Sequence, residues 1–379
     1  MRVCYVSPTF ETFDGWGRYS RALVDASAAA GIDVVVVTTS EADTTGLATA
    51  AVRRVLPPLS LRRLRGLLQV AAVPRLRRAV GDCDLVHVLV EPCLPAVALA
   101  VARSRPLVMT AHGTWAVRPL AGVVAGAVPR RLVKRLDLLV CQSAVTRDAM
   151  AARVSLPDHV VAPGGVALEA FERPGLPIPG VPAGARVVLT VGAVKPRKGH
   201  DLALEALARA AEAVGPLHWV VVGDVEANPG WFQTLVRRAS TVEPALTVHW
   251  LGRVSHDQLV GCYRRADVFL LTPAAVEHAF EGLGLVFLEA AACGLPSITC
   301  HGTGAVEAVR HLETGLVVAE DDARAAGEAL VQVLTDEALR RQLGASARAF
   351  ARQMTWGHLA TRLIREYRRL VSLARAEDG

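Results

Sequence analysis

The chain has 379 residues, of which 52% are hydrophobic and 21% charged, with a formal net charge of +6. This composition is globular and excludes an intrinsically disordered chain, and the length exceeds what one hydrophobic core usually serves, so we expect two domains. No uncharged apolar run approaches the roughly 20 residues of a membrane-spanning helix.

Strand-like and helix-like segments alternate along the chain. In the first half, buried strands are predicted at residues 2–7, 33–39, 84–90, 107–110 and 138–142, with a helix at 16–30. In the second half, strands are predicted at residues 186–191, 218–222, 247–251, 268–272, 296–299 and 315–318, with a helix at 201–214. Strands that alternate with helices predict parallel sheets. The expected fold class is therefore α/β, with two Rossmann-like, doubly wound domains.

A segment rich in proline and glycine separates the two halves. Residues 171–184 contain four prolines and three glycines, which do not form a regular element. We expect a first domain at 1–170, a linker at 171–185 and a second domain at 186–355. A final arginine-rich helix is predicted from Trp356, within residues 356–379.

Two glycines precede the first helix, and a histidine follows a later strand. Open parallel sheets bind ligands at the carboxyl ends of their strands. Gly15 and Gly17 could offer backbone N–H groups to an anionic donor there, although an ordinary turn before a helix is the alternative. A dinucleotide fold is not expected, because Ser20 occupies the third glycine position. His112 is a candidate for substrate contact, with a structural histidine as the alternative.

Cations cluster after the first strand of the second half. Arg197 and Lys198 lie in a loop bounded by Gly192 and Gly199. Arginine pairs with phosphate oxygens through two parallel hydrogen bonds and lysine acts as a point charge, so this pair is a candidate diphosphate site.

The strongest signal is the segment from Glu281 to Pro296. Its two carboxylates, Glu281 and Glu289, are eight positions apart and flank a helix predicted to begin near Leu285. Backbone N–H groups before that helix can hold a phosphate or sugar hydroxyls; they belong to Gly282, Leu283, Gly284 and Leu285. Glu289 could accept both hydroxyls of a ribose, and Glu281 could contact the sugar.

This segment resembles the E-x7-E motif of the retaining glycosyltransferases of family 4, which have the GT-B fold. The resemblance extends over nearly the whole chain: Gly15 and Gly17 are similar to the family's glycine loop, and His112 to its active-site histidine. It implies that Arg197 and Lys198 bind the donor's diphosphate and that Arg253 and Val254 frame the nucleobase. Residues 302–307 resemble the loop beside the donor sugar, and the helix from Trp356 resembles the helix that crosses back to the first domain.

The resemblance implies two domains facing a central cleft, a nucleoside diphosphate sugar as co-substrate, and no cofactor or metal. The chain departs from the family pattern at Asp14, Trp16, Leu283 and Thr303, and we expect these departures to affect the choice of substrate. The D-x-D sequence at residues 82–84 resembles a metal motif of another transferase fold, but it precedes a strand and is interpreted as a solvated turn.

Surplus positive charge lies in the first half. Residues 1–165 carry 20 Lys and Arg against 12 Asp and Glu, and residues 166–379 carry 22 against 24. The Arg53–Arg78 region and a second cluster at 130–135 are candidates for docking on an anionic membrane surface. A polyanionic acceptor and a merely solvated surface are the alternatives. Nucleic-acid binding is not expected, because aromatic residues are not interleaved with the basic ones.

We therefore expect a metal-independent hexosyltransferase of EC class 2.4. It would transfer a sugar, with retention of configuration, from a UDP- or GDP-sugar to a sugar, glycan or lipid-linked acceptor hydroxyl. An epimerase, a phosphorylase and a non-catalytic sugar-nucleotide-binding protein are the alternatives. Seven cysteines without framework spacing, together with an N-terminus that reads as a strand instead of a secretory signal, predict a cytoplasmic location, with peripheral attachment to the inner face of the membrane as an open alternative.

Overall fold

The computed structural model describes residues 1–58, 65–122, 124–242 and 244–378. The chain divides into two compact units. The first comprises Met1–Gly164 together with the C-terminal residues from Trp356 onward, and the second comprises Gly165–Thr355. Residues 171–185, expected above to be a linker, group with the second unit.

The first unit is built on a parallel sheet of seven strands. Their order is β3-β2-β1-β4-β5-β6-β7, and every pairing is parallel. The strands are β1 (Arg2–Val6), β2 (Asp33–Thr39), β3 (Ala51–Leu56), β4 (Leu85–Val88), β5 (Leu107–Ala111), β6 (Leu138–Cys141) and β7 (His159–Val161). Strands β1, β4, β5 and β6 are almost wholly buried, as expected for a parallel sheet that helices cover on both faces.

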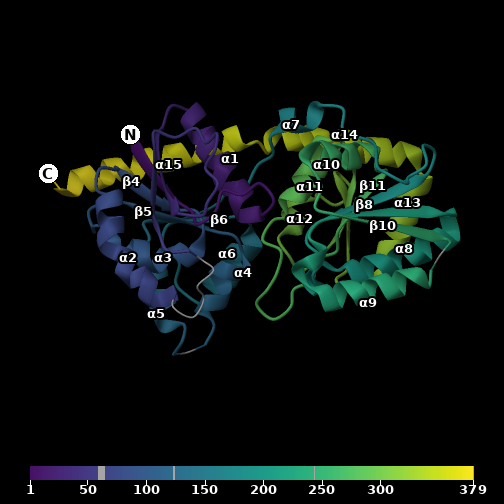
Figure 1. Ribbon diagram of the computed structural model, residues 1–379, viewed down its shortest axis with the longest axis horizontal. Coiled ribbons are helices and arrows are strands. Elements are labelled where there is room, and N and C mark those ends of the chain that lie inside the picture. The colour runs from purple at the N-terminus through teal and green to yellow at the C-terminus, as the bar shows by residue number, and fades with distance from the viewer. Residues whose placement is uncertain (59–64, 123, 243, 379) are drawn as a thin grey trace. The chain divides into compact units, whose positions relative to one another are not determined.

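Helices cover both faces of this sheet (Figure 1). Helix α1 packs against α15 on one face, and α2, α3 and α5 are neighbours on the other. The helices are α1 (Gly15–Ala29), α2 (Arg65–Ala79), α3 (Leu94–Ala100), α4 (Thr114–Val117), α5 (Ala127–Val133), α6 (Ala144–Ala151) and α15 (Trp356–Asp378), with 3₁₀ turns η1 (Glu91–Cys93) and η2 (Arg118–Leu120).

The second unit repeats the architecture with six parallel strands in the order β10-β9-β8-β11-β12-β13. The strands are β8 (Arg186–Val191), β9 (Leu217–Val222), β10 (Leu246–Gly252), β11 (Val268–Leu270), β12 (Ser297–Cys300) and β13 (Gly315–Val318). The helices are α7 (Leu168–Glu172), α8 (His200–Val214), α9 (Pro229–Ser240), α10 (His256–Arg265), α11 (Leu285–Ala292), α12 (Ala305–Ala308), α13 (Ala323–Thr335) and α14 (Glu337–Gln353), with 3₁₀ turns η3 (Pro196–Lys198) and η4 (Val225–Ala227).

The predicted α/β class with two doubly wound sheets is confirmed, but two strands of the first sheet were not predicted. Strand β3 contains Arg53 and Arg54 within a short apolar segment, and β7 has only three residues. Neither shows the continuous apolar run that marks a buried parallel strand.

The two arginines of β3 form hydrogen bonds with other residues of the first unit. Arg53 forms two hydrogen bonds with Asp82, at 2.6 and 2.8 Å, and also binds the carbonyl of Ala79. Arg54 donates to the carbonyls of Thr39, Ser40 and Ala42. Both guanidinium groups therefore make contacts within the fold, and their part in a membrane-docking surface stays a prediction. Arg62 and Arg63 lie outside the described residues, as does the side chain of Arg65.

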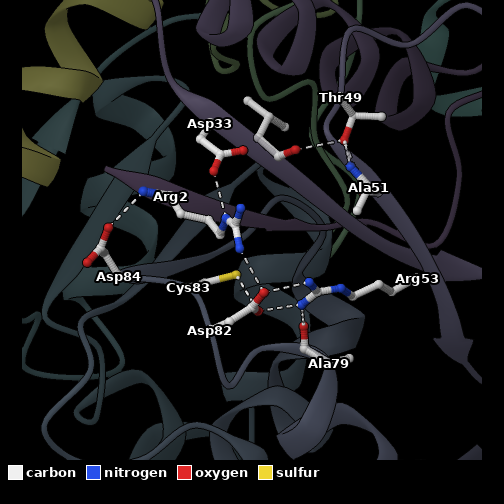
Figure 2. A network of polar contacts seen from close by, with 10 residues as sticks. Arg2, Asp33, Thr49, Ala51, Arg53, Ala79, Asp82, Cys83 and Asp84 are labelled. Carbon is white, nitrogen blue, oxygen red and sulfur yellow. Dashed lines mark hydrogen bonds and ion pairs between the residues drawn. The ribbon is translucent and has the colours of Figure 1, made fainter.

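The D-x-D sequence lies at the amino ends of the strands, as predicted, but it forms an ion-pair network and not simply a solvated turn (Figure 2). Asp82 lies between Arg53 and Arg2, and the Arg2 guanidinium also binds Asp33 at 2.7 Å. Hydrogen bonding to Arg53 lowers the pKa of Asp82. The carboxylate of Asp84 accepts from the backbone N–H of Arg2 and from Arg375 on α15. Both carboxylates are thus engaged by arginine residues.

Helix α15 completes the core of the first unit. Its residues Leu359, Leu363 and Tyr367 are buried in the same apolar cluster as strands β1 and β2. The Tyr367 hydroxyl lies 2.6 Å from Nδ1 of His87 on β4, and Nε2 of His87 lies 2.9 Å from the Thr110 hydroxyl. Burial lowers the pKa of His87 to about 3, so the ring is neutral and needs one donor and one acceptor partner.

Within the described residues, none of the helices has the length and apolar character needed to cross a membrane.

We expect Tyr367→Phe to destabilise the protein by about 1–3 kcal/mol, because the substitution leaves a buried nitrogen of His87 without a partner. Arg375→Ala is the matched control on the same helix. It removes an ion pair whose arginine side chain is 73% exposed, and such pairs contribute about 0–1 kcal/mol. Urea unfolding of both variants measures the difference. Equal effects would contradict the anchoring role of the buried contact.

Candidate active site

The basic loop after β8 and the segment that begins at Glu281 meet in the second unit. Nζ of Lys198 lies 2.7 Å from Oε2 of Glu281, and Nη1 of Arg197 lies 3.0 Å from the same oxygen. The basic pair and Glu281 are separate signals in the sequence, because Glu281 is 84 positions from Arg197 and 83 from Lys198. The fold brings them into one cluster, which we call the cation–carboxylate cluster.

Close backbone packing places the basic loop. Strands β8 and β11 are neighbours in the sheet, so the loops at their carboxyl ends leave the sheet side by side. Gly199 has a left-handed φ of 68°, and a Cβ there would lie 1.9 Å from the carbonyl oxygen of Thr272. The Thr272 hydroxyl donates to the Gly199 carbonyl at 3.0 Å. Only glycine fits this contact, and it directs the preceding Lys198 toward Glu281.

The cation–carboxylate cluster carries a net positive charge. Burial disfavours the ionised form of Glu281, but the charges and hydrogen bonds of Lys198 and Arg197 outweigh it and lower the pKa of the carboxyl to about 2. One carboxylate thus faces two cations. The side chains are 11% exposed for Lys198, 14% for Glu281 and 33% for Arg197. The surplus charge is therefore only partly screened by water and suits a polyanion such as a diphosphate.

Helix α11 begins at Leu285, as predicted, and it follows directly on Glu281–Gly284. Gly284 is the N-cap, with a left-handed φ of 79°, and no side chain among the described residues caps the helix there. A Cβ at Gly284 would lie 2.8 Å from the ring of Phe287, so glycine is needed for packing as well as for backbone conformation. The helix thus presents backbone N–H groups, including that of Leu285, beside buried Gly282 and Leu283.

Glu289 is buried one turn into α11. Its Oε2 accepts a hydrogen bond of 2.9 Å from the hydroxyl of Tyr263 on α10. Tyr263 packs against the rings of Phe171 and Phe269. Sequence reasoning missed Tyr263, because a tyrosine on the apolar face of a helix is typical of a core position.

The predicted nucleobase segment lies at the end of β10. Arg253 donates to Asp224, at the end of β9, over 2.8 Å, and this hydrogen bond lowers the pKa of Asp224. Val254 lines a cavity of about 210 Å³, and the other lining residues are Pro177, Ile178, Pro179, Leu251, Gln258 and Cys262. Sequence reasoning missed Asp224, which only the pairing of β9 with β10 brings to Arg253.

In the first unit, Gly15 is the first residue of α1, and Gly17 follows in its first turn. The carboxylate of Asp14 caps the helix and accepts the N–H of Gly17 at 2.7 Å. A Cβ at Gly17 would lie 2.1 Å from the carbonyl oxygen of Glu11. Close backbone approach therefore requires Gly17 to be glycine, and its N–H group is already bonded to Asp14.

His112 directly follows β5 at its carboxyl end. Its backbone N–H donates to Oε1 of Glu91 at 2.6 Å, and its Nε2 donates to the carbonyl of Leu89 at 2.7 Å. The ring of Tyr19 packs edge-on against the imidazole at 4.8 Å between centroids. Burial lowers the pKa of His112 to about 4. The imidazole is therefore neutral near pH 7, with its proton on Nε2 and an acceptor lone pair on Nδ1.

Across the part of the chain that the structure describes, no group of three His, Cys, Asp or Glu side chains is arranged to hold a metal ion.

The lowered pKa of Glu281 predicts an acid-sensitive contribution to stability. The ionised carboxylate stabilises the fold above pH about 4.5, and this contribution is lost as the pH falls toward about 2. We expect Glu281→Gln to cost about 2 kcal/mol or more at pH 7 and less at pH 3. Urea unfolding from pH 7 to pH 3 measures both, with Glu205→Gln, whose salt bridge with Arg209 is exposed, as the control. A pH-independent difference would contradict the assignment.

Comparison with known proteins places this geometry in a family. The family model for Glycosyltransferase Family 4 matches residues 13–170, and that for Glycosyl transferases group 1 matches residues 177–350. A GDP-mannose-dependent alpha-(1-6)-phosphatidylinositol monomannoside mannosyltransferase of Mycobacterium tuberculosis is 30% identical over 310 residues, 76% of this chain and 77% of that protein. A D-inositol 3-phosphate glycosyltransferase of Rhodococcus opacus is 31% identical over 294 residues, 71% of this chain and 64% of that protein.

Solved structures agree on the fold. Sucrose-phosphate synthase from Thermosynechococcus elongatus superposes with a TM-score of 0.77 at 22% identity, covering 98% of this chain and 99% of that chain. Anabaena HepE in complex with UDP and glucose superposes with a TM-score of 0.76 at 18% identity, covering 97% and 99%. The chain is a nucleotide-sugar glycosyltransferase with the GT-B fold, and it belongs to glycosyltransferase family 4.

Proposed function

We propose that the protein is a retaining, metal-independent hexosyltransferase that takes mannose from GDP-mannose and transfers it to an acceptor bearing an inositol phosphate. The cation–carboxylate cluster is the observation that carries the proposal, because it offers surplus positive charge at the carboxyl ends of the strands. The names of the relatives support the donor and the inositol-containing acceptor.

The reaction needs a stabilised leaving group and a stabilised sugar cation. Lys198, Arg197 and the N–H groups at the start of α11 would bind the departing diphosphate. Glu281 would hold donor-sugar hydroxyls and stabilise the positive charge that develops on the sugar ring. Glu289, oriented by Tyr263, would accept the ribose hydroxyls. The Arg253 and Val254 segment would contact the base.

His112 would accept a hydrogen bond from a sugar hydroxyl at Nδ1, because Nε2 is committed to the Leu89 carbonyl. In the retaining step, the acceptor oxygen attacks C1 of the donor sugar from the side of the leaving group. The bond from C1 to the diphosphate oxygen breaks, and that oxygen takes the proton of the acceptor hydroxyl. No cofactor is required for this balance of bonds and protons.

Aromatic residues near His112 suit the acceptor. Trp115 lies three residues after His112, is 43% exposed, and packs against Trp16 of α1 at 5.7 Å between ring centroids. Exposed indole rings can stack on the apolar face of a sugar or cyclitol ring. Trp16 is one of the departures from the family's glycine loop, so this pair is a candidate determinant of acceptor choice.

A membrane-docking surface is proposed on α2, α3 and α5, which are neighbours (Figure 1). The apolar side chains exposed there and on the adjoining loop are Val70, Leu99, Val124 and Val128. The exposed basic side chains are Arg75, Arg77, Arg78, Arg103, Arg131 and Lys134. No acidic residue occurs within residues 44–81 or 92–136. Exposed apolar side chains together with exposed cations suit an anionic lipid surface.

Two arginines of the second basic cluster do not belong to this surface. Arg130 donates to the carbonyls of Leu120 and Gly122, and Arg135 donates to that of Val101. Peripheral attachment would bring the first unit to a lipid-linked acceptor. None of the seven cysteines forms a disulfide, which supports a reducing, cytoplasmic compartment.

GDP-mannose is expected to raise the melting temperature more than UDP-, ADP- or dTDP-sugars and to undergo slow hydrolysis. Lys198→Ala should lower kcat/KM for GDP-mannose about 100-fold or more, because the lysine acts on the charge of the leaving group. Lys195→Ala, an exposed lysine of the same loop, is the control.

Unchanged turnover in Lys198→Ala would refute the site. Turnover without any acceptor dependence would favour an epimerase, dependence on inorganic phosphate a phosphorylase, and binding without turnover a non-catalytic protein.

The double variant Arg131→Glu, Lys134→Glu is expected to lose sedimentation with vesicles of phosphatidylglycerol and phosphatidylcholine at low salt, because it replaces two exposed cations of α5 and its edge with anions. Its control is Arg237→Glu, Arg238→Glu on α9 of the second unit, which should sediment like the wild type. Failure of the wild type to sediment at low salt would rule out the membrane surface.

A further inference from the structure

Glu91 is a buried carboxyl that the proposed reaction leaves unused. It begins η1, directly after β4, and the residue is 7% exposed. Its Oε1 accepts the backbone N–H of His112 at 2.6 Å. Its Oε2 is buried and has no hydrogen-bond partner among the described residues. Because β4 and β5 are adjacent, one side chain reaches from the end of one strand to the end of the next.

The titratable side chains on η1 and directly after β5 are Cys93 and His112, besides Glu91 itself. Helix α2 reaches η1 through a hydrogen bond from Gln69 to the Pro92 carbonyl, and its arginines Arg75, Arg77 and Arg78 are exposed. The elements packed most closely against η1 are α3, α4 and β5. Their sequences, LPAVALA, TWAV and LVMTA, carry no ionisable side chain. Burial raises the pKa of Glu91 to about 7, although hydrogen bonds from the backbone N–H groups of His112 and of Glu91 itself partly oppose the shift.

Two hydrogen bonds hold His112, in addition to the packing of the Tyr19 ring. Glu91 holds the backbone N–H, and the Leu89 carbonyl holds Nε2 of the ring. Gly113 then turns the chain into α4 with φ of 113° and ψ of −110°, a conformation open to glycine alone. The carboxyl of Glu91 is therefore one of the groups that fix the backbone from which the imidazole projects.

We propose that Glu91 is a positioning residue that sets the place of the His112 imidazole through the backbone amide. The ionised carboxylate of Glu91 accepts a strong hydrogen bond from the His112 amide, and the protonated carboxyl accepts a weaker one. The inference rests on the proposed role of His112 in transfer. It adds that one buried carboxyl makes this role dependent on pH in the neutral range.

Two pH dependences follow. A charge-assisted hydrogen bond is roughly twice as strong as a neutral one, so kcat is expected to fall about fivefold as the pH drops from about 8 to about 6. Stability changes in the opposite sense. The folded-state pKa lies above the ordinary value of 4.5, so stability is fully present below pH 4.5 and is lost as the pH rises toward about 7.

Glu91→Gln keeps the shape and the acceptor oxygen but cannot ionise. We expect this variant to flatten the kcat profile for GDP-mannose hydrolysis between pH 6 and pH 8. In ¹⁵N-resolved NMR, the His112 amide should titrate near pH 7 in the wild type and stay constant in Glu91→Gln. This second measurement does not depend on the donor.

Asp137→Asn is the matched control, because Asp137 accepts the backbone N–H of Leu107 at 2.7 Å, at the opposite end of the same strand. It should keep both the kcat profile and the amide titration. If Glu91→Gln keeps them too, the positioning role is overturned. If His112→Ala retains transfer, the proposed role of His112 fails, and the positioning role fails with it. Loss of transfer in His112→Ala with an unchanged Glu91→Gln profile overturns the positioning role alone.

Discussion

In the second unit, two cations share one carboxylate at the edge where the parallel strands end. This interaction determines how the unit is organised. Lys198 and Arg197 reach Glu281 only because β8 and β11 are neighbours and Gly199 lets their loops touch. The same loop leads into α8, and Glu281 leads into α11. Displacing the basic loop would therefore leave a carboxylate and two cations partly buried and unpaired, which is costly. The charge that suits a donor diphosphate also holds the site together.

The first unit places its candidate site residue, His112, by hydrogen bonds instead of by an ion pair. His112 is held through its backbone and its ring, and a chain of buried polar groups continues from it. Tyr19 packs on His112 and its hydroxyl lies 3.4 Å from Thr110, which contacts His87, which contacts Tyr367 of α15. Such networks are stable only when every member has a partner. The helix at the end of the chain thus supports the strand that ends at His112.

Sequence reasoning predicted the features that are encoded within a few neighbouring residues. Buried strands are continuous apolar runs, and the turn at Glu281–Leu285 carries its glycines and carboxylate within a few residues, so both could be read directly. The partners of those residues could not. Tyr263 reaches Glu289, Asp224 reaches Arg253 and Glu91 reaches His112 across 21 to 29 residues of chain, through strand pairing and helix packing. A count of arginines also did not reveal that Arg53, Arg54, Arg130 and Arg135 make contacts within the fold.

The buried face of α15 has a consequence for biosynthesis. Leu359, Leu363, Tyr367 and Leu370 belong to the core of the first unit, yet the whole second unit precedes them in the chain. On the ribosome, the second unit is translated in full before α15, whereas the first unit needs the residues of α15. Until α15 is translated, only α1 among the described helices contributes side chains to that apolar cluster of the first sheet, and Nδ1 of His87 lacks the Tyr367 hydroxyl. The first unit can therefore become native only after the whole second unit has been translated.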